Sequence, residues 1–302
     1  MIHGILNVRK EKGFTSHDVV AKLRGMTRQK KIGHTGTLDP DAEGVLPVCL
    51  GKATKLCERM TDKEKVYEAV MVLGKETDTQ DLSGTVLKTG ETDRLTEEEV
   101  RRAVHSFEGS YDQIPPMYSA VKVGGKKLYE LAREGKEIER KPRRVEIRSI
   151  RILEMKLPEV KFEVVCSKGT YIRTLCSDIG QALGCGACMG SLLRKRSGTF
   201  TLEDSHTLSE IDTFLKEGRI GEILIPVDAM FPEAPKVSVR RGQERAVYNG
   251  NALVPDQLEE TLSPEDGEEI RVYGPDQSFL ALYRFDQREK KYKVEKMFYS
   301  PE

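Results

Sequence analysis

A polar stretch, residues 31–44, leads directly into a short apolar run, residues 45–50. Three glycines and a proline within fourteen residues make the polar stretch a poor helix and a poor strand. The apolar run is closed by Gly51 and is typical of a buried strand. We therefore expect a polar loop held against a hydrophobic core, which is a usual place for catalytic or binding residues.

Asp39 is the residue of this loop whose side-chain direction the neighbouring residues restrict most strongly. It stands between Leu38 and Pro40, and the proline pushes the preceding residue toward extended geometry. A carboxylate of preset direction suits a nucleophile or a general base. Aspartate before proline also begins turns, however, and turn aspartates are far commoner than catalytic ones. The local residues alone therefore favour a turn.

Two other chemistries fit this loop poorly. A phosphate-binding loop needs Gly, four residues and then Gly-Lys-Ser/Thr. Here six residues separate Gly44 from Gly51-Lys52, and Ala53 follows the lysine. A metal site made of His34, Asp39 and Asp41 would lack a second histidine at helical or hairpin spacing.

Residues 33–40, Gly-His-Thr-Gly-Thr-Leu-Asp-Pro, with Gly-Val-Leu-Pro at 44–47, resemble the core motif of the TruB family of tRNA pseudouridine synthases. The resemblance implies an enzyme that isomerises the T-loop uridine at tRNA position 55 and uses no cofactor and no metal. It also implies that Asp39 is the catalytic aspartate and that His34 lies beside the flipped nucleotide.

Two further segments match motifs of the same family. In Lys-Val-Tyr at 65–67, the resemblance places Tyr67 against the target base and makes its hydroxyl a candidate for proton transfer. In Lys-Gly-Thr-Tyr-Ile-Arg at 168–173, it implies that Arg173 pairs with the catalytic aspartate and that Tyr171 lines the pocket.

The position of Arg173 points independently to a carboxylate partner. With Thr170 as the N-cap, Arg173 would occupy the third position of a helix, where the helix dipole disfavours a cation. An arginine placed against that preference suggests an ion pair. The alternative is an exposed arginine, which would cost only a few tenths of a kcal/mol.

The resemblance also suggests substrate-binding and supporting residues. Lys10 matches the lysine of the family pattern that precedes the first helix, although Arg9 and Glu11 depart from that pattern. The polar turn at 74–81 resembles the family, and Asp78 is expected to support the site.

The segment Gly-Ser-Leu-Leu-Arg-Lys-Arg-Ser-Gly at 190–198 matches the family too. Leu192 is expected to line the pocket, and Arg194 and Arg196 to face phosphate.

Net charge is zero over 302 residues, but the charges are segregated. Residues 122–148 hold ten Lys or Arg against five Glu. Tyr118 and Tyr129 are interleaved with the basic residues of the wider segment 111–148, and basic charge with stacking side chains is a composition that suits RNA binding. A flexible surface insertion is the alternative reading. Residues 114–122 resemble the family's insertion that clamps the T-arm of tRNA. The expected contacts to the RNA backbone are Lys31, Lys122, Arg140, Lys141, Arg143, Arg144, Arg194 and Arg196.

We expect a two-domain α+β protein. A pseudouridine synthase catalytic domain on a mixed or antiparallel sheet would span 1–231, with the RNA-gripping insertion at about 111–148. A proline-rich linker precedes short strand patterns, so 235–302 is predicted to be a small PUA-like β-barrel. An acidic run, 256–269, should lie away from RNA.

Six cysteines without a signal peptide or a transmembrane run indicate reduced thiols and a cytoplasmic protein. Cys185 and Cys188 form one CxxC pair, for which packing near a helix end is the simpler explanation. We expect tRNA as the partner, no membrane, no protein partner and a monomer.

Two other function classes stay open at this stage. A non-catalytic tRNA-binding protein or RNA chaperone would share the basic insertion, whereas the joint presence of Asp39, Tyr67 and Arg173 favours an enzyme. A carboxylate hydrolase would need a second catalytic acid, which the sequence does not identify.

Overall fold

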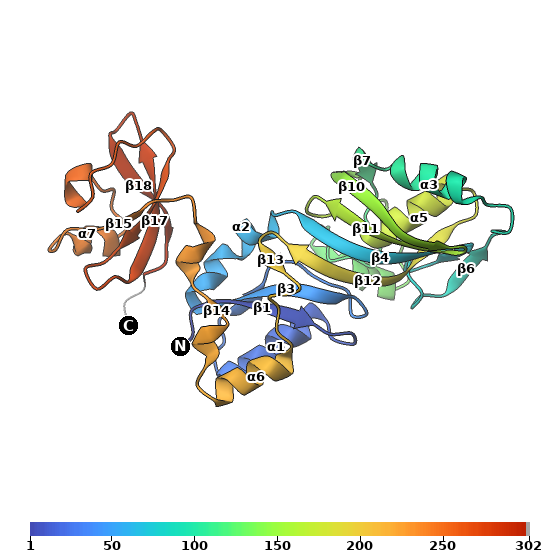
Figure 1. The fold of residues 1–302 in the computed structure, drawn as a ribbon, viewed down its shortest axis with the longest axis horizontal. Coiled ribbons are helices and arrows are strands. Elements are labelled where there is room, and N and C mark those ends of the chain that lie inside the picture. The colour runs from blue at the N-terminus through green and yellow to red at the C-terminus, as the bar shows by residue number, and fades with distance from the viewer. Residues whose placement is uncertain (300–302) are drawn as a thin grey trace.

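The computed structural model describes residues 1–299 and shows a large domain built on one sheet, with a small C-terminal domain beside it (Figure 1). Eight strands follow one another in the order β14-β1-β3-β12-β4-β11-β10-β7, while β2 pairs with β3 and β13 with β12. The β3–β12 pairing is parallel and the other described pairings in this sheet are antiparallel, which confirms the predicted mixed α+β fold. The strands are β1 (Gly4–Lys10), β2 (Ile32–His34), β3 (Glu43–Leu50), β4 (Lys65–Leu73), β7 (Gly109–Gln113), β10 (Arg143–Lys156), β11 (Glu159–Cys166), β12 (Ala187–Ser197), β13 (Phe200–Thr201) and β14 (Leu224–Ile225).

Helices bury the apolar side chains of this sheet in two groups. α3 packs on β10 and on α5, which lies over β4 and β12, whereas α1 and α6 pack together beside β1 and β3. No helix within residues 1–299 is long and apolar enough to span a membrane. The helices and 3-10 turns are α1 (Ser16–Thr27), η1 (Gly51–Leu56), α2 (Cys57–Thr61), α3 (Glu97–His105), α4 (Leu128–Arg133), α5 (Ile172–Ala182), α6 (Leu208–Lys216), η2 (Ile220–Glu222), η3 (Val227–Met230), α7 (Glu244–Tyr248) and η4 (Pro255–Gln257).

Local sequence signals set the start of two helices. Thr15 Oγ1 accepts from the Asp18 backbone N–H at 3.0 Å, and the Asp18 carboxylate accepts from the Thr15 N–H at 2.8 Å. Thr96 and Glu99 make the same reciprocal pair before α3. Each capping box satisfies N–H groups that a helix start leaves unpaired.

The predicted start of α5 is wrong by one residue. Its N-cap is Tyr171, which makes no side-chain capping bond, and Arg173 occupies the second helical position. The Thr170 hydroxyl does not cap the helix and donates instead to the Ser167 carbonyl at 3.0 Å, inside the preceding turn. The helix dipole still disfavours a cation at Arg173, and no acidic residue in the first turn offsets it.

The predicted insertion begins and ends in the large sheet. β7 and β10 pair with each other, with Gln113 opposite Arg143, so residues 114–142 form the segment between them. That segment holds the hairpin β8 (Lys122–Val123) and β9 (Lys126–Lys127), followed by α4. A second small hairpin, β5 (Lys75–Thr77) with β6 (Val86–Thr89), follows β4.

The C-terminal domain is a four-stranded sheet in the order β15-β16-β17-β18, which confirms the predicted strands. They are β15 (Lys236–Ser238), β16 (Glu269–Tyr273), β17 (Phe279–Asp286) and β18 (Lys291–Met297). Phe231, Phe279 and Phe298 pack with Leu56 and Met60 of the large domain. The proline-rich segment is therefore part of a shared hydrophobic core.

Candidate active site

The loop after β2 is held from several sides. The Ser16 hydroxyl accepts from the Leu38 N–H at 2.8 Å and lies 3.2 Å from the Leu38 carbonyl. The Pro40 carbonyl accepts from Lys10 Nζ and from the Gly13 N–H, each at 3.0 Å. Asp39 lies between these two anchored residues, so its backbone has little freedom.

Arg194 supports the same loop from β12. Its Nε donates to the Val45 carbonyl at 2.6 Å and its Nη2 donates to the Gly36 carbonyl at 3.2 Å. Gly44 lets the strands approach closely, because a Cβ there would lie 2.2 Å from the Arg194 carbonyl oxygen and its φ is +106°.

Asp39 and Arg173 form a two-point ion pair. Arg173 Nε lies 2.9 Å from Asp39 Oδ2, and Nη2 lies 3.2 Å from Oδ1. The arginine side chain is only 5% exposed, while 36% of the aspartate side chain remains accessible. A guanidinium held at both carboxylate oxygens fixes the direction of the carboxylate as well as its charge.

Three other oxygens hold Arg173 in place. Nη1 donates to the Thr79 carbonyl at 2.9 Å, and Nη2 donates to the Tyr118 carbonyl at 2.8 Å. Asp81 Oδ2 lies 3.7 Å from Nη1. The β4–β6 region and the insertion thus converge on one guanidinium at the N-terminus of α5.

A cavity of about 250 Å³ opens beside this ion pair. Its walls include Asp39, Tyr67, Tyr171, Leu192 and Arg173, so the structure brings together all of these predicted site residues. Tyr67 is 8% exposed and faces Arg194 across the β4–β12 pairing. Burial raises the pKa of Tyr67, so its hydroxyl stays protonated at neutral pH.

The charge state of Asp39 reflects opposing influences. Burial raises the pKa of Asp39 above its ordinary value, and Asp81 acts in the same direction. Arg173 and, more weakly, Lys10 lower the pKa of Asp39. Of the neighbouring charged groups, Arg173 therefore does most to keep the Asp39 carboxylate ionised.

Four predicted roles need correction or narrowing. Lys10 is fully buried and donates to the Glu11 and Pro40 carbonyls, so its observed role is to support the loop. Arg194 is 1% exposed, bonds the loop and lines the cavity, so it is not a surface cation. Asp78 accepts from the Thr85 N–H within the β5–β6 turn, and Asp81 is the carboxylate beside Arg173.

The fourth role is that of His34. Its Nδ1 accepts from the Gly36 N–H at 3.4 Å, and the residue lies on β2 outside the cavity lining. Burial lowers the pKa of His34, which favours the neutral ring. Direct contact with the flipped nucleotide stays a prediction for this residue.

The predicted contacts to the RNA backbone divide by exposure. Arg140 donates to the Pro115 carbonyl at 3.2 Å, and Arg196 pairs with Glu64, so both have structural partners. Apart from the buried Arg194, the others are exposed, namely Lys31, Lys122, Lys141, Arg143 and Arg144. Tyr129 lies between Lys127 and Arg133, whose charged groups are 5.3 and 5.5 Å from its ring centre.

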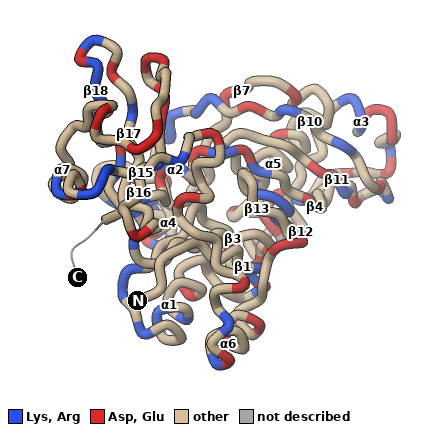
Figure 2. The backbone as a smooth tube through the Cα atoms, turned by 60° about the vertical axis from the view of Figure 1, so that its left-hand side comes forward, with Lys and Arg blue, Asp and Glu red and all other residues tan. Residues whose placement is uncertain are grey.

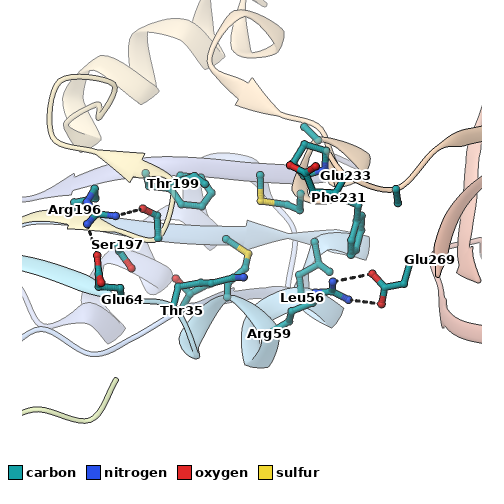
Figure 3. Close-up of a pocket in the computed structure, with 18 of the residues that line it drawn as sticks. Thr35, Leu56, Arg59, Glu64, Arg196, Ser197, Thr199, Phe231, Glu233 and Glu269 are labelled. Atoms are coloured by element: carbon teal, nitrogen blue, oxygen red, sulfur yellow. Dashed lines mark hydrogen bonds and ion pairs between the residues drawn. The ribbon is translucent and has the colours of Figure 1, made fainter. Parts of the chain in front are cut away.

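A second, larger cavity of about 990 Å³ lies between the two domains (Figure 3). It is lined by apolar residues such as Phe231 and by ion pairs such as Arg59–Glu269, at 2.9 Å. Glu268 and Glu269 of the acidic run line this cavity. Figure 2 shows Asp and Glu residues in red along the loops of the C-terminal domain. Asp39 and Arg173 are absent from its lining, so its size does not make it the reactive site.

The geometry therefore defines a class: an aspartate–arginine ion pair beside a cavity with aromatic walls, set in a mixed-sheet fold. Two solved structures share that fold over nearly the whole chain. One is an H/ACA RNP bound to a substrate RNA containing 2'-deoxyuridine, with 28% identity, a TM-score of 0.71 and coverage of 99% of this chain and 86% of that chain. The other is a Cbf5-Nop10-Gar1 complex, with 30% identity, a TM-score of 0.71 and coverage of 98% and 85%.

Sequence comparison narrows this class. Residues 24–172 match the TruB family pseudouridylate synthase N-terminal domain, and residues 173–232 match the tRNA pseudouridylate synthase B C-terminal domain. A protein named tRNA pseudouridine synthase B from Lachnoclostridium phytofermentans is 52% identical to this chain, and the match covers 98% of this chain and 100% of that protein. A protein of the same name from Bacillus pumilus is 43% identical, and the match covers 94% of this chain and 93% of that protein. The chain belongs to the TruB family of pseudouridylate synthases.

Sequence reasoning missed several supporting groups. The Thr79 and Tyr118 carbonyls carry no side-chain signal, because any residue supplies a carbonyl oxygen. The sequence does contain a signal for Asp81, since this residue lies three positions after Asp78 in the same polar turn. Gln113 ends β7 and bonds to the backbone of Tyr171, a contact that no local pattern indicates.

Proposed function

We propose that this protein isomerises uridine to pseudouridine in tRNA and that its target is the T-loop uridine at position 55. The observation that carries the proposal is the Asp39–Arg173 pair, at 2.9 and 3.2 Å, in the wall of a small cavity with two tyrosines. Membership of the TruB family and the names of the relatives support the same reaction.

In this proposal the uracil leaves the RNA stack and enters the cavity, which costs a few kcal/mol of stacking and pairing. Asp39 acts as the nucleophile, on either the ribose C1′ or the uracil C6. The N1–C1′ glycosidic bond breaks, the base turns, and a bond forms between C1′ and C5. The bond to Asp39 breaks to restore the carboxylate, and the C5 proton leaves. Tyr67 and Tyr171 orient the base, and the Tyr67 hydroxyl handles a proton.

Binding of the RNA is assigned to the exposed cations of the insertion. Lys141, Arg143 and Arg144 lie together where the insertion returns to the sheet, and Tyr129 supplies an aromatic surface. Such contacts position the RNA without reading its sequence. The C-terminal domain, a PUA-like RNA-binding module in this proposal, extends the same substrate surface, and the protein acts as a cytoplasmic monomer.

Tritium release from tRNA transcripts labelled at uracil C5 tests the function directly. The wild-type protein should release tritium from a transcript with uridine at position 55 and none from a transcript with cytidine there. Equal binding of tRNA without tritium release would favour the alternative, a non-catalytic tRNA-binding protein or RNA chaperone.

A further inference from the structure

Gln113 joins the start of the insertion to the helix that carries Arg173. It is the last residue of β7 and is 1% exposed. Its Oε1 accepts from the Tyr171 N–H at 2.8 Å, and its Nε2 donates to the Tyr171 carbonyl at 3.0 Å. The same amide nitrogen lies 2.6 Å from the Tyr111 hydroxyl, so the carboxamide is held on both sides.

This contact anchors the N-cap residue of the helix. Tyr171 is the N-cap of α5 and offers no capping side chain, so the first turn lacks the usual support from its own residues. The carboxamide of Gln113 fixes both the N–H and the carbonyl of that residue instead. Arg173 follows two residues later, so a small rotation of this turn would move its guanidinium against Asp39.

The insertion contacts the same turn at a second point. Five residues beyond Gln113, the Tyr118 carbonyl accepts from Arg173 Nη2 at 2.8 Å. The next carbonyl, that of Ser119, accepts from the Tyr129 N–H of α4 at 3.1 Å. A continuous series of bonds therefore runs from the basic insertion to the ion pair.

We propose that Gln113 is a positioning residue of the reaction: its carboxamide holds the first turn of α5 so that Arg173 stays aligned with Asp39 when the insertion binds RNA. This proposal rests on the function proposed above. Gln113 does not itself line the cavity, but it bonds the backbone of Tyr171, which does, so it acts through the first turn of α5 and Arg173.

The chain supplies a matched control in Gln29. This glutamine is 6% exposed and makes the same two-way bond to a backbone, accepting from the Ile2 N–H at 2.9 Å and donating to the Ile2 carbonyl at 3.2 Å. Gln113→Leu and Gln29→Leu thus remove equivalent bonds while keeping side-chain volume. Gln113→Ala and Gln113→Asn serve as further variants in case leucine impairs folding.

The readout is the ionisation of Asp39, measured by carbon NMR of labelled aspartate in the free protein and by the acid limb of single-turnover kinetics. Arg173 opposes the effects of burial and Asp81 on this carboxyl, and Lys10 is the other cation that faces it. Loosening Arg173 should raise the pKa of Asp39, so the acid limb should move to higher pH in Gln113→Leu and stay in place in Gln29→Leu.

We also expect the single-turnover rate of Gln113→Leu at saturating tRNA to fall by about tenfold, with little change in KM. Combined with Arg173→Lys, the loss should be smaller than the product of the two separate losses. An unchanged pKa of Asp39 in Gln113→Leu would overturn the role of Gln113. The role would also be overturned if the rate losses of Gln113→Leu and Arg173→Lys multiplied in the double variant and Gln29→Leu behaved in the same way. A wild-type protein that forms no pseudouridine would contradict the proposed function alone, since the NMR titration still decides the role of Gln113.

Discussion

Arg173 and Asp39 are 134 residues apart in the chain, yet the guanidinium meets both carboxylate oxygens, at 2.9 and 3.2 Å. The aspartate comes from an irregular loop and the arginine from the first turn of α5. This ion pair links the Asp39 carboxylate to the insertion, because the Tyr118 carbonyl accepts from the same guanidinium. The predictions below test this arrangement and its surroundings.

Asp39→Asn should abolish pseudouridine formation and leave tRNA affinity nearly unchanged. Asparagine keeps the shape of the side chain but cannot act as an anionic nucleophile. Tritium release measures turnover, and filter binding measures affinity. Turnover near the wild-type rate would remove Asp39 from the chemistry.

Arg173→Lys should lower single-turnover activity by at least about tenfold, equivalent to about 1.4 kcal/mol, because an ammonium cannot hold two carboxylate oxygens in a fixed plane. The acid limb of the rate should also shift to higher pH, since Arg173 lowers the pKa of Asp39. Circular dichroism confirms folding. Full activity with an unshifted limb would show that the pairing is dispensable.

Replacing Lys141, Arg143 and Arg144 with alanine should weaken tRNA binding most at low salt. Each lost phosphate contact should make the slope of log affinity against log salt shallower by roughly 0.7 to 0.9. Turnover at saturating tRNA should largely recover, because these exposed side chains lie outside the cavity lining. Arg140 is kept, since it bonds the Pro115 carbonyl.

The control for this variant removes the same charge from Arg94, Arg101 and Arg102, which are exposed on and before α3. Its salt slope should match that of the wild type. A collapse of saturated turnover in the insertion variant would place these cations inside the reactive site, and an unchanged slope would make them a solvated surface.

Asp178→Asn should stabilise the protein at pH 7 to 8. Burial raises the pKa of Asp178 to about 6, with a smaller opposing effect of the Tyr111 hydroxyl. Because the folded pKa is raised, the protonated carboxyl stabilises the fold at low pH, and that contribution is lost as the pH rises from about 4 through about 6.

We expect a gain of roughly 1 to 2 kcal/mol in the free energy of unfolding at neutral pH, after allowance for partial solvent screening. Urea titrations of both proteins at pH 4 and pH 8 measure it. The difference should disappear at pH 4, and an equal difference at both values would exclude ionisation as its cause.

Local sequence determined much of this protein. The capping boxes at Thr15 and Thr96 follow from a three-residue spacing, and strand patterns follow from a two-residue alternation, so neighbours in the chain suffice to predict them. The motif around Asp39 identified the family for the same reason, since its residues are contiguous.

The tertiary structure alone decided which side chains meet and which are buried. The sequence predicts that Lys10 binds substrate and that Arg194 faces phosphate. The sheet order places β1 and β12 on either side of β3, and both side chains are buried against the loop that carries Asp39. The bond from Gln113 to Tyr171 spans 58 residues. Such contacts depend on strand order and register across the whole sheet, which no short window of sequence contains.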